Sequence, residues 1–80
     1  MSRRHRGNRL LVLGATHYQI PFIEYARTQG CHVITVDWDL SNPAHAHADE
    51  SHEVSTTDPD AVLALAHRIG IDAITTFGSD

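Results

Sequence analysis

The stretch from residue 9 to residue 21 constrains the fold of this chain more than any other part of it. It opens with an unbroken apolar run, LLVL, which is how a strand reads when both of its faces are covered. Gly14 and Ala15 follow, and such small residues allow a tight turn and a close approach of a ligand to the backbone. Thr16, with Gln19 three residues later, fits a capping box, so a helix is expected to begin there. A helix that starts at the carboxyl end of a buried strand presents free N–H groups, and the turn is therefore a candidate site for an anionic or carbonyl ligand.

Pro21 complicates the start of the helix, which is predicted over residues 16–29. Proline has no N–H and removes one backbone hydrogen bond, so we expect a distorted first turn rather than a regular helix from Thr16 onward. Apolar residues then recur at three- and four-residue steps and form one face that covers the sheet. These residues are Ile20, Phe22, Ile23 and Ala26. Gly30 is expected to end the helix as its left-handed C′ residue.

The other predicted elements are apolar or β-branched runs bounded by turn signals. The predicted strands cover residues 31–36, 52–54 and 71–77. The first of them closes at Asp37, and a long connection over 38–48 leads to the second, whose polarity suits a sheet edge. Asp58, followed by a proline, is the N-cap of a second helix that Gly70 stops.

Strands and helices in this succession predict an α/β domain with a parallel sheet of about four strands and two helices. A further turn and helix would be expected after the last strand, and the sequence stops at Asp80 without them. We therefore expect the chain to be a fragment of a larger protein, or a domain completed by another chain.

The composition is that of a folded protein and argues against two classes of partner. Hydrophobic residues make up 41% and charged residues 20% of the 80 residues, as in globular chains. The formal charge of −4, with no lysine, argues against nucleic-acid binding, because phosphate neutralisation needs a surplus of cations. Apolar runs are too short to cross a membrane. A single cysteine, Cys31, cannot form an internal disulfide, so a cytoplasmic location is expected. Residues 1–8 carry three of the six arginines and are predicted to be a flexible basic tail.

The turn at Gly14 does not carry a dinucleotide-binding fingerprint, because Thr16 and Gln19 stand where G-x-G-x-x-G would require glycines. Asp37 closes the second strand near the position of the ribose-binding acid in dinucleotide folds. Without the glycines this acid is weak evidence, and NAD(P) binding is a minor alternative. The absence of lysine excludes a P-loop and argues against a self-contained ATP site.

Two groups of residues invite a metal hypothesis, and in each the structural explanation is favoured. Asp37 and Asp39 could hold Mg²⁺ through water, but such a pair more often forms a solvated strand end. His45, His47 and His52 are chemically suited to zinc, yet they fall in a predicted surface loop without cysteine support. A loop that is simply rich in histidine is favoured, and metal binding by the three histidines is left open. No nucleophile–base pair with its orienting residue can be identified from spacing.

Several segments in order resemble a known family. They are LGATHYQIP at 13–21, VDWD at 36–39, NPAH at 42–45, ADE at 48–50, STTD at 55–58 and TFGSD at 76–80. Together they look like the N-terminal, pre-ATP-grasp domain of ATP-grasp carboxylate–amine ligases. The resemblance covers residues 9–80, which we take as one domain after the tail.

The resemblance implies a Rossmann-like parallel sheet with strand order 3-2-1-4. In that family the domain packs beside an ATP-grasp catalytic domain that binds ATP and Mg²⁺ and makes an acyl-phosphate, which an amine attacks. The lysines and metal-binding groups of that catalytic domain have no counterpart here. This chain is therefore expected to bind neither cofactor alone, and to need a catalytic domain in the same or another chain.

By the same resemblance, the turn after the first strand and the loop after the fourth face a small carboxylate or amine substrate. The residues expected to contact it are Gly14, Ala15, Thr16, Gln19, Gly78, Ser79 and Asp80. No catalytic residue is expected in this chain.

Two alternatives remain open from the sequence. One is a stand-alone, Rossmann-like nucleotide-binding module in which Asp37 contacts the cofactor. The other is a non-catalytic interaction domain that docks through a sheet edge or through the face left bare after the last strand. A homodimer is one form that such docking could take.

Overall fold

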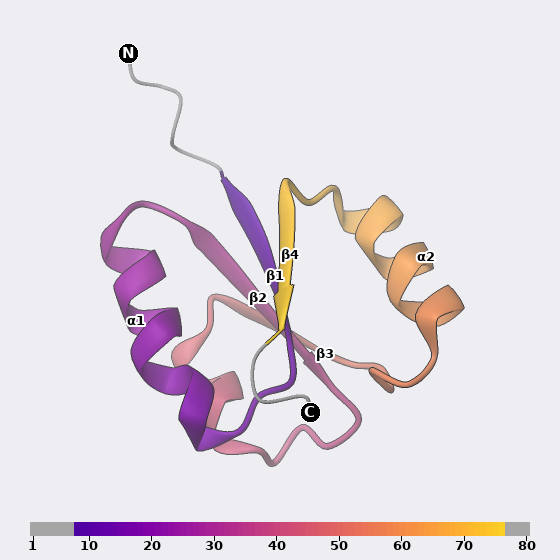
Figure 1. Ribbon diagram of the computed structural model, residues 1–80, viewed down its shortest axis with the longest axis horizontal. Helices are drawn as coiled ribbons and strands as arrows, with labels where there is room; N and C mark the ends of the chain where they lie inside the picture. The colour runs from indigo at the N-terminus through magenta and orange to yellow at the C-terminus, as the bar shows by residue number, and fades with distance from the viewer. Residues whose placement is uncertain (1–7, 77–80) are drawn as a thin grey trace.

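The computed structural model describes residues 8–76, which form a four-stranded parallel sheet with helices on both faces (Figure 1). The strands are β1 (Arg9–Leu13), β2 (His32–Asp37), β3 (Glu50–Glu53) and β4 (Ala73–Thr76). The α-helices are α1 (Ile20–Thr28) and α2 (Pro59–Ile69), and the short 3-10 helices are η1 (His17–Gln19) and η2 (Pro43–His47). Over residues 8–76, no helix combines the length and apolar character needed to cross a membrane.

The strand order is β3-β2-β1-β4, and every pairing is parallel. The predicted α/β class, order and direction are therefore confirmed. The chain steps outward from β1 to β3 and then returns across the sheet to β4. Because parallel crossovers are right-handed, this reversal puts α1 on one face and α2 on the other, as Figure 1 shows.

Two hydrophobic clusters, one on each face, explain the unbroken apolar run of β1. Leu11 faces α2, where it packs in one cluster with Val62 and Leu65. Val12, the next residue, faces α1 and packs in the other cluster with Ile23. Successive side chains of a strand point to opposite faces, so a strand covered on both sides is apolar at every position.

The start of α1 corrects part of the prediction. The distorted first turn is confirmed, because the 3-10 helix η1 precedes α1 and Pro21 lies in the first turn of α1. The capping box is wrong, because the Thr16 hydroxyl donates to Oε1 of Gln19 at 2.6 Å instead of accepting from a backbone N–H. Pro21 lacks an N–H, and α1 begins where that missing donor would have had no helical partner.

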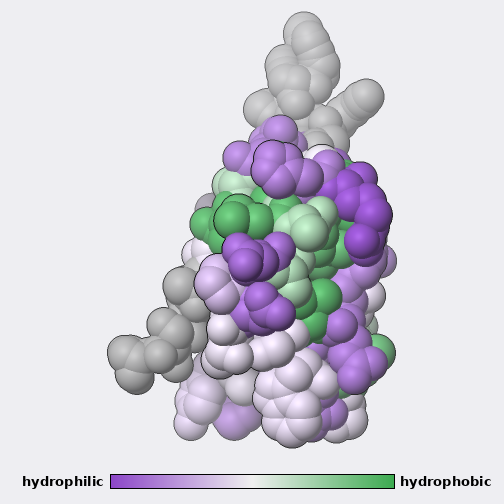
Figure 2. Space-filling model, turned by 90° about the vertical axis from the view of Figure 1, so that its right-hand side faces the viewer, coloured by the Kyte–Doolittle hydropathy of each residue, from purple (hydrophilic) through white to green (hydrophobic). Residues whose placement is uncertain are grey.

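The ends of the helices are as predicted. Gly30 has a φ of +90° just after the last turn of α1. The Asp58 side chain accepts a hydrogen bond from the N–H of Ala61 at 3.2 Å, which is the expected N-cap of α2. On α2, Leu65 is buried, whereas Leu63 is 52% exposed. Figure 2 looks onto this side of the molecule, where hydrophobic and hydrophilic residues are mixed.

The starts of three strands and the content of one connection differ from the prediction. β2 begins at His32, one residue after the predicted start. β3 begins at Glu50, two residues before the predicted start, because its register is set by backbone pairing with β2 rather than by side-chain polarity. β4 begins at Ala73, and Phe77 lies outside the described residues. The connection predicted over 38–48 contains the helix η2, which no periodic pattern announced.

Candidate functional site

The glycine turn lies at the carboxyl edge of the sheet, where β1 ends between β2 and β4. Gly14 has a φ of +99°, and its N–H donates to the carbonyl of Val36 at 2.8 Å. Ala15 is fully buried, and its carbonyl accepts from the N–H of Ala44 at 2.8 Å. The strand order reverses at β1, and open α/β sheets bind ligands outside the carboxyl ends of the strands at such a reversal. The predicted turn therefore occupies the position where this fold can hold a ligand.

The side chain of Gln19 lies against the turn and supports it. Its side chain is 3% exposed, and its Oε1 accepts the hydroxyl of Thr16 at 2.6 Å. A Cβ added at Gly14 would lie 3.2 Å from the Nε2 atom of Gln19. Glycine at this position thus provides both the left-handed backbone and the room for the amide.

The backbone after the turn offers hydrogen-bond donors. In the part of the chain that the structure describes, the N–H groups of Thr16, His17 and Tyr18 donate no hydrogen bond. Donors at the start of a helix suit a carbonyl or carboxylate oxygen. This edge can therefore bind a small polar ligand through its main chain.

Arginines are placed away from this edge in the described part of the chain. Arg9 opens β1, and Arg27 and Arg68 lie in the last turns of α1 and α2. Those positions belong to the amino edge of the sheet, because each helix runs back from the carboxyl edge to the start of the next strand. Within residues 8–76, no guanidinium therefore stands beside the glycine turn to fix a phosphate.

Asp37 lies against the turn and is 6% exposed. Its Oδ2 accepts the N–H of Ala15 and the side-chain amide of Asn42, both at 2.9 Å. Its Oδ1 accepts the N–H of Asp39 at 3.3 Å. The predicted contact of Asp37 with a cofactor stays a prediction, whereas its contact with the turn is a feature of the fold.

Asn42 and Ala44 take part in this arrangement and were not predicted to do so. Asn42 holds the carboxylate of Asp37, and the N–H of Ala44 holds the turn. The signals available were the turn-forming pair Asn42-Pro43 and the segment NPAH of the resemblance, and neither of them indicates a partner on another element. Of the predicted substrate contacts, residues 14–16 and Gln19 lie together. Gly78, Ser79 and Asp80 lie outside the described residues, as do residues 1–7 of the predicted tail.

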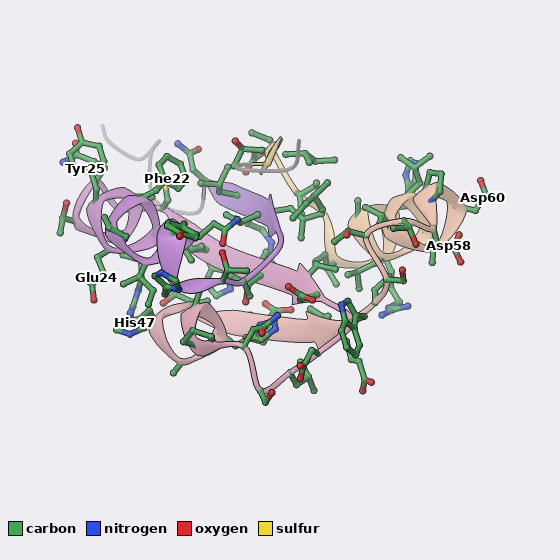
Figure 3. The ribbon with its side chains drawn as sticks, turned by 60° about the horizontal axis from the view of Figure 1, so that its bottom comes forward. Phe22, Glu24, Tyr25, His47, Asp58 and Asp60 are labelled. Atoms are coloured by element: carbon green, nitrogen blue, oxygen red, sulfur yellow. The ribbon has the colours of Figure 1, made fainter. Side chains whose placement is uncertain are left out.

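The three histidines considered for zinc have three different partners. The ring of His45 is buried, with Nδ1 2.7 Å from the hydroxyl of Thr35. His47 pairs with Glu24 of α1 at 2.8 Å, and the two side chains point toward each other in Figure 3. His52 pairs with Glu50 at 2.7 Å. Across residues 8–76, no group of three or more potential ligands is arranged to hold a metal ion.

The side chain of Glu50, on the edge strand β3, contacts side chains from three strands. The pKa of Glu50 lies below the ordinary value of 4.5. The largest cause is the hydrogen bond from His52 to the carboxylate, and the next is the hydrogen bond from His32. Arg9 of β1 lies 3.5 Å from the same carboxylate. A carboxylate whose pKa is lowered by folding stabilises the protein above its unfolded pKa, and this contribution is lost as the pH falls through the folded pKa.

Replacing Glu50 by glutamine is therefore expected to lower the free energy of unfolding at pH 6 by about 0.5–1 kcal/mol, the range of partly exposed ion pairs. The difference from the wild type should shrink as the pH is lowered from 6 toward 3. Urea unfolding followed by circular dichroism across this range measures it. Glu53→Gln, on the exposed end of the same strand, is the matched control. An unchanged Glu50→Gln difference at every pH would contradict the expectation.

The fold and the position of the turn define a class of protein domain. The chain has the architecture of the pre-ATP-grasp domain, the Rossmann-like domain at the N-terminus of ATP-grasp enzymes. One match among solved structures is the structure of glycinamide-RNase-transformylase T from Mycobacterium tuberculosis, with a TM-score of 0.80 and 31% sequence identity. It covers 85% of this chain and 20% of that chain, so this chain spans about a fifth of the matched protein. This match confirms the resemblance predicted from the sequence.

No family model matches the chain. A search of curated proteins also gave no match.

Proposed function

We propose that this chain is the substrate-side, N-terminal domain of an ATP-dependent carboxylate–amine ligase of the ATP-grasp type. The observation that carries the proposal is the structural match, which extends over 85% of the chain at 31% identity. The strand order and the glycine turn at the reversal point agree with it. The proposal includes a cytoplasmic location.

In this proposal the carboxyl edge forms one wall of the active site and contacts a small carboxylate or amine. Gly14 and Ala15 form the turn that places the free N–H of Thr16 toward the substrate, and Gln19 supports that turn. The predicted loop residues Gly78, Ser79 and Asp80 would complete this wall, since β4 ends beside the end of β1, where Leu13 pairs with Thr76. The role of this chain is to bind and orient the substrate.

ATP and Mg²⁺ belong to the catalytic domain, in the same or another chain, and supply the activation of the carboxylate. The residues described here fit that division. The chain has no lysine to contact a nucleoside triphosphate. Among residues 8–76, no cluster of three or more His, Cys, Asp or Glu side chains is placed to hold a metal ion. We therefore expect no cofactor on this chain alone.

A titration of the ¹⁵N-labelled chain tests the proposal. Glycinamide and glycine are the amine probes, formate is the carboxylate probe, and MgATP is the cofactor probe. At least one small probe is expected to shift the amide signals of residues 14–19 with millimolar affinity, which corresponds to about −4 kcal/mol. MgATP is expected to shift none of them. Tight binding of MgATP, or shifts by no small probe, would contradict the proposal.

NADH and AMP, added to the same sample, test the alternative of a stand-alone nucleotide-binding module. Binding of either one, with a loss of affinity in Asp37→Ala, would favour that alternative. The coding locus gives an independent observation. An ATP-grasp catalytic domain encoded in the same or an adjacent reading frame is expected.

A further inference from the structure

We infer that Asp37, oriented by Asn42, is a positioning residue of this site, which holds the peptide of Ala15 and does not itself contact a ligand. The part of this inference that concerns a ligand rests on the proposed function. The part that concerns the turn rests on the geometry of the carboxylate alone.

The carboxylate of Asp37 is turned toward the protein rather than toward solvent. Its Oδ2 receives two hydrogen bonds of 2.9 Å, from the N–H of Ala15 and from Nδ2 of Asn42. Its Oδ1 receives the N–H of Asp39 at 3.3 Å, and the residue is 6% exposed. An acid that binds a ribose must present its oxygens to the sugar hydroxyls. Here both oxygens already accept donors from the protein, and the carboxylate is screened from the outside.

The charge of Asp37 makes this contact a strong one. Burying a carboxylate is unfavourable unless hydrogen bonds compensate for the lost water. Bonds from N–H groups to an ionised oxygen are roughly twice as strong as bonds between neutral groups. Ala15 has its N–H on Asp37 and its carbonyl on the N–H of Ala44, so both sides of this residue are fixed. The orientation of the N–H groups that follow at Thr16 and His17 depends on that residue.

Asn42 keeps the carboxylate in the orientation that Ala15 requires. Its amide donates to the same oxygen as Ala15, and its backbone N–H donates to the carbonyl of Asp39 at 3.1 Å. Within residues 8–76, Asp37 provides the one side-chain hydrogen bond to the backbone of Gly14 and Ala15. The pair Asp37 and Asn42 is therefore the part of this support that a substitution can alter.

The test compares Asp37→Ala with Asp37→Asn in the full chain. In Asp37→Ala, the Ala15 N–H loses its side-chain acceptor altogether. Hydrogen exchange of the Ala15 amide is expected to accelerate by at least about tenfold, the loss expected for a bond to a charged group. Its proton signal should also move upfield. Asp37→Asn can keep an uncharged oxygen at the position of Oδ2, within reach of Ala15 and Asn42, and is expected to recover part of both signals.

Asp39→Ala is the matched control, because it removes a carboxylate that binds Ser41 and not the turn. It is expected to leave the Ala15 amide unchanged. If Asp37→Ala does not fold, Asn42→Ala retains the charge and is expected to speed exchange at Ala15 by a smaller, few-fold factor. An Ala15 amide that is unchanged in Asp37→Ala, or in this milder variant, overturns the inference.

Titration of the same variants with glycinamide and AMP separates this inference from the proposed function. Glycinamide shifts at residues 14–19 should weaken in Asp37→Ala and return in part in Asp37→Asn. AMP binding that is lost in Asp37→Asn although the Ala15 signals recover would show direct ligand contact and overturn the inference. If no probe binds while the Ala15 signals are lost and recovered, the proposed function fails and the positioning role is supported.

Discussion

Replacing Leu65 by alanine is expected to lower the free energy of unfolding by about 2–5 kcal/mol, the range for leucine truncation in a core. Leu65 is 2% exposed and packs in one cluster with Leu11, Ile34 and Val36 of the sheet. α2 contributes three buried residues to this cluster, and Leu65 is the most completely buried of them. Total stabilities of small domains are about 5–15 kcal/mol, so this single loss is a large fraction. Urea unfolding followed by circular dichroism measures it.

Leu63→Ala is the matched control for this prediction. It makes the same chemical change two positions away on α2, where the side chain is 52% exposed. Its effect is expected to be within about 0.5 kcal/mol, as for surface substitutions. Equal losses in the two variants would mean that α2 does not pack on the sheet through Leu65.

The architecture could be predicted because most of its elements have local signals. α2 has an N-cap at Asp58, a proline after it, apolar residues at helical spacing and a glycine at its end, and all four agree with the structure. The unbroken apolar run of β1 is a direct consequence of burial on both faces. The resemblance supplied the strand order, which local patterns do not contain.

The errors occur where contacts distant in sequence or competing local bonds decide the structure. β3 begins at Glu50, a charged residue that carries no apolar signal, because the backbone of β2 sets the pairing. Thr16 had two partners within reach, the N–H and the side chain of Gln19, and the sequence does not show that the hydroxyl takes the side chain. His45 was read as part of a surface loop, but η2 turns its ring inward against Thr35.

The candidate site could be predicted only in part, because some of its contacts join residues that are distant in sequence. Its central turn is a local feature, and Gly14 could be identified from the end of an apolar run. The support of the turn is not local, because Asp37 and Ala15 are 22 positions apart, with Asp37 at the end of β2 and Ala15 in the turn after β1. Sequence reasoning identified Asp37 as an acid of interest but not the partner that its carboxylate holds.

Gly14→Ala is expected to destabilise the chain more than Gly30→Ala, although both glycines have left-handed backbones with φ of +99° and +90°. The strain of an L-residue in this region is about 1–2 kcal/mol and applies to both variants. At Gly14 the new Cβ also lies 3.2 Å from Nε2 of Gln19, whereas at Gly30 nothing lies within 4 Å. Overpacking of a buried contact adds about 1–3 kcal/mol, so the total at Gly14 is expected to reach about 2–5 kcal/mol. Urea unfolding of the two variants measures the difference.

A double-mutant cycle with Gln19→Ala determines whether this difference arises from the contact with Gln19. The amide of Gln19 is buried, and its Oε1 is held by the hydroxyl of Thr16, so it cannot move aside freely. Once the side chain is truncated, Gly14→Ala should cost no more than Gly30→Ala, because only the backbone strain remains. A cost at Gly14 that stays high in the Gln19→Ala background would place the conflict elsewhere in the turn. If the two costs become equal in the Gln19→Ala background, glycine is needed at position 14 for two reasons: its left-handed backbone and the space that the side chain of Gln19 occupies.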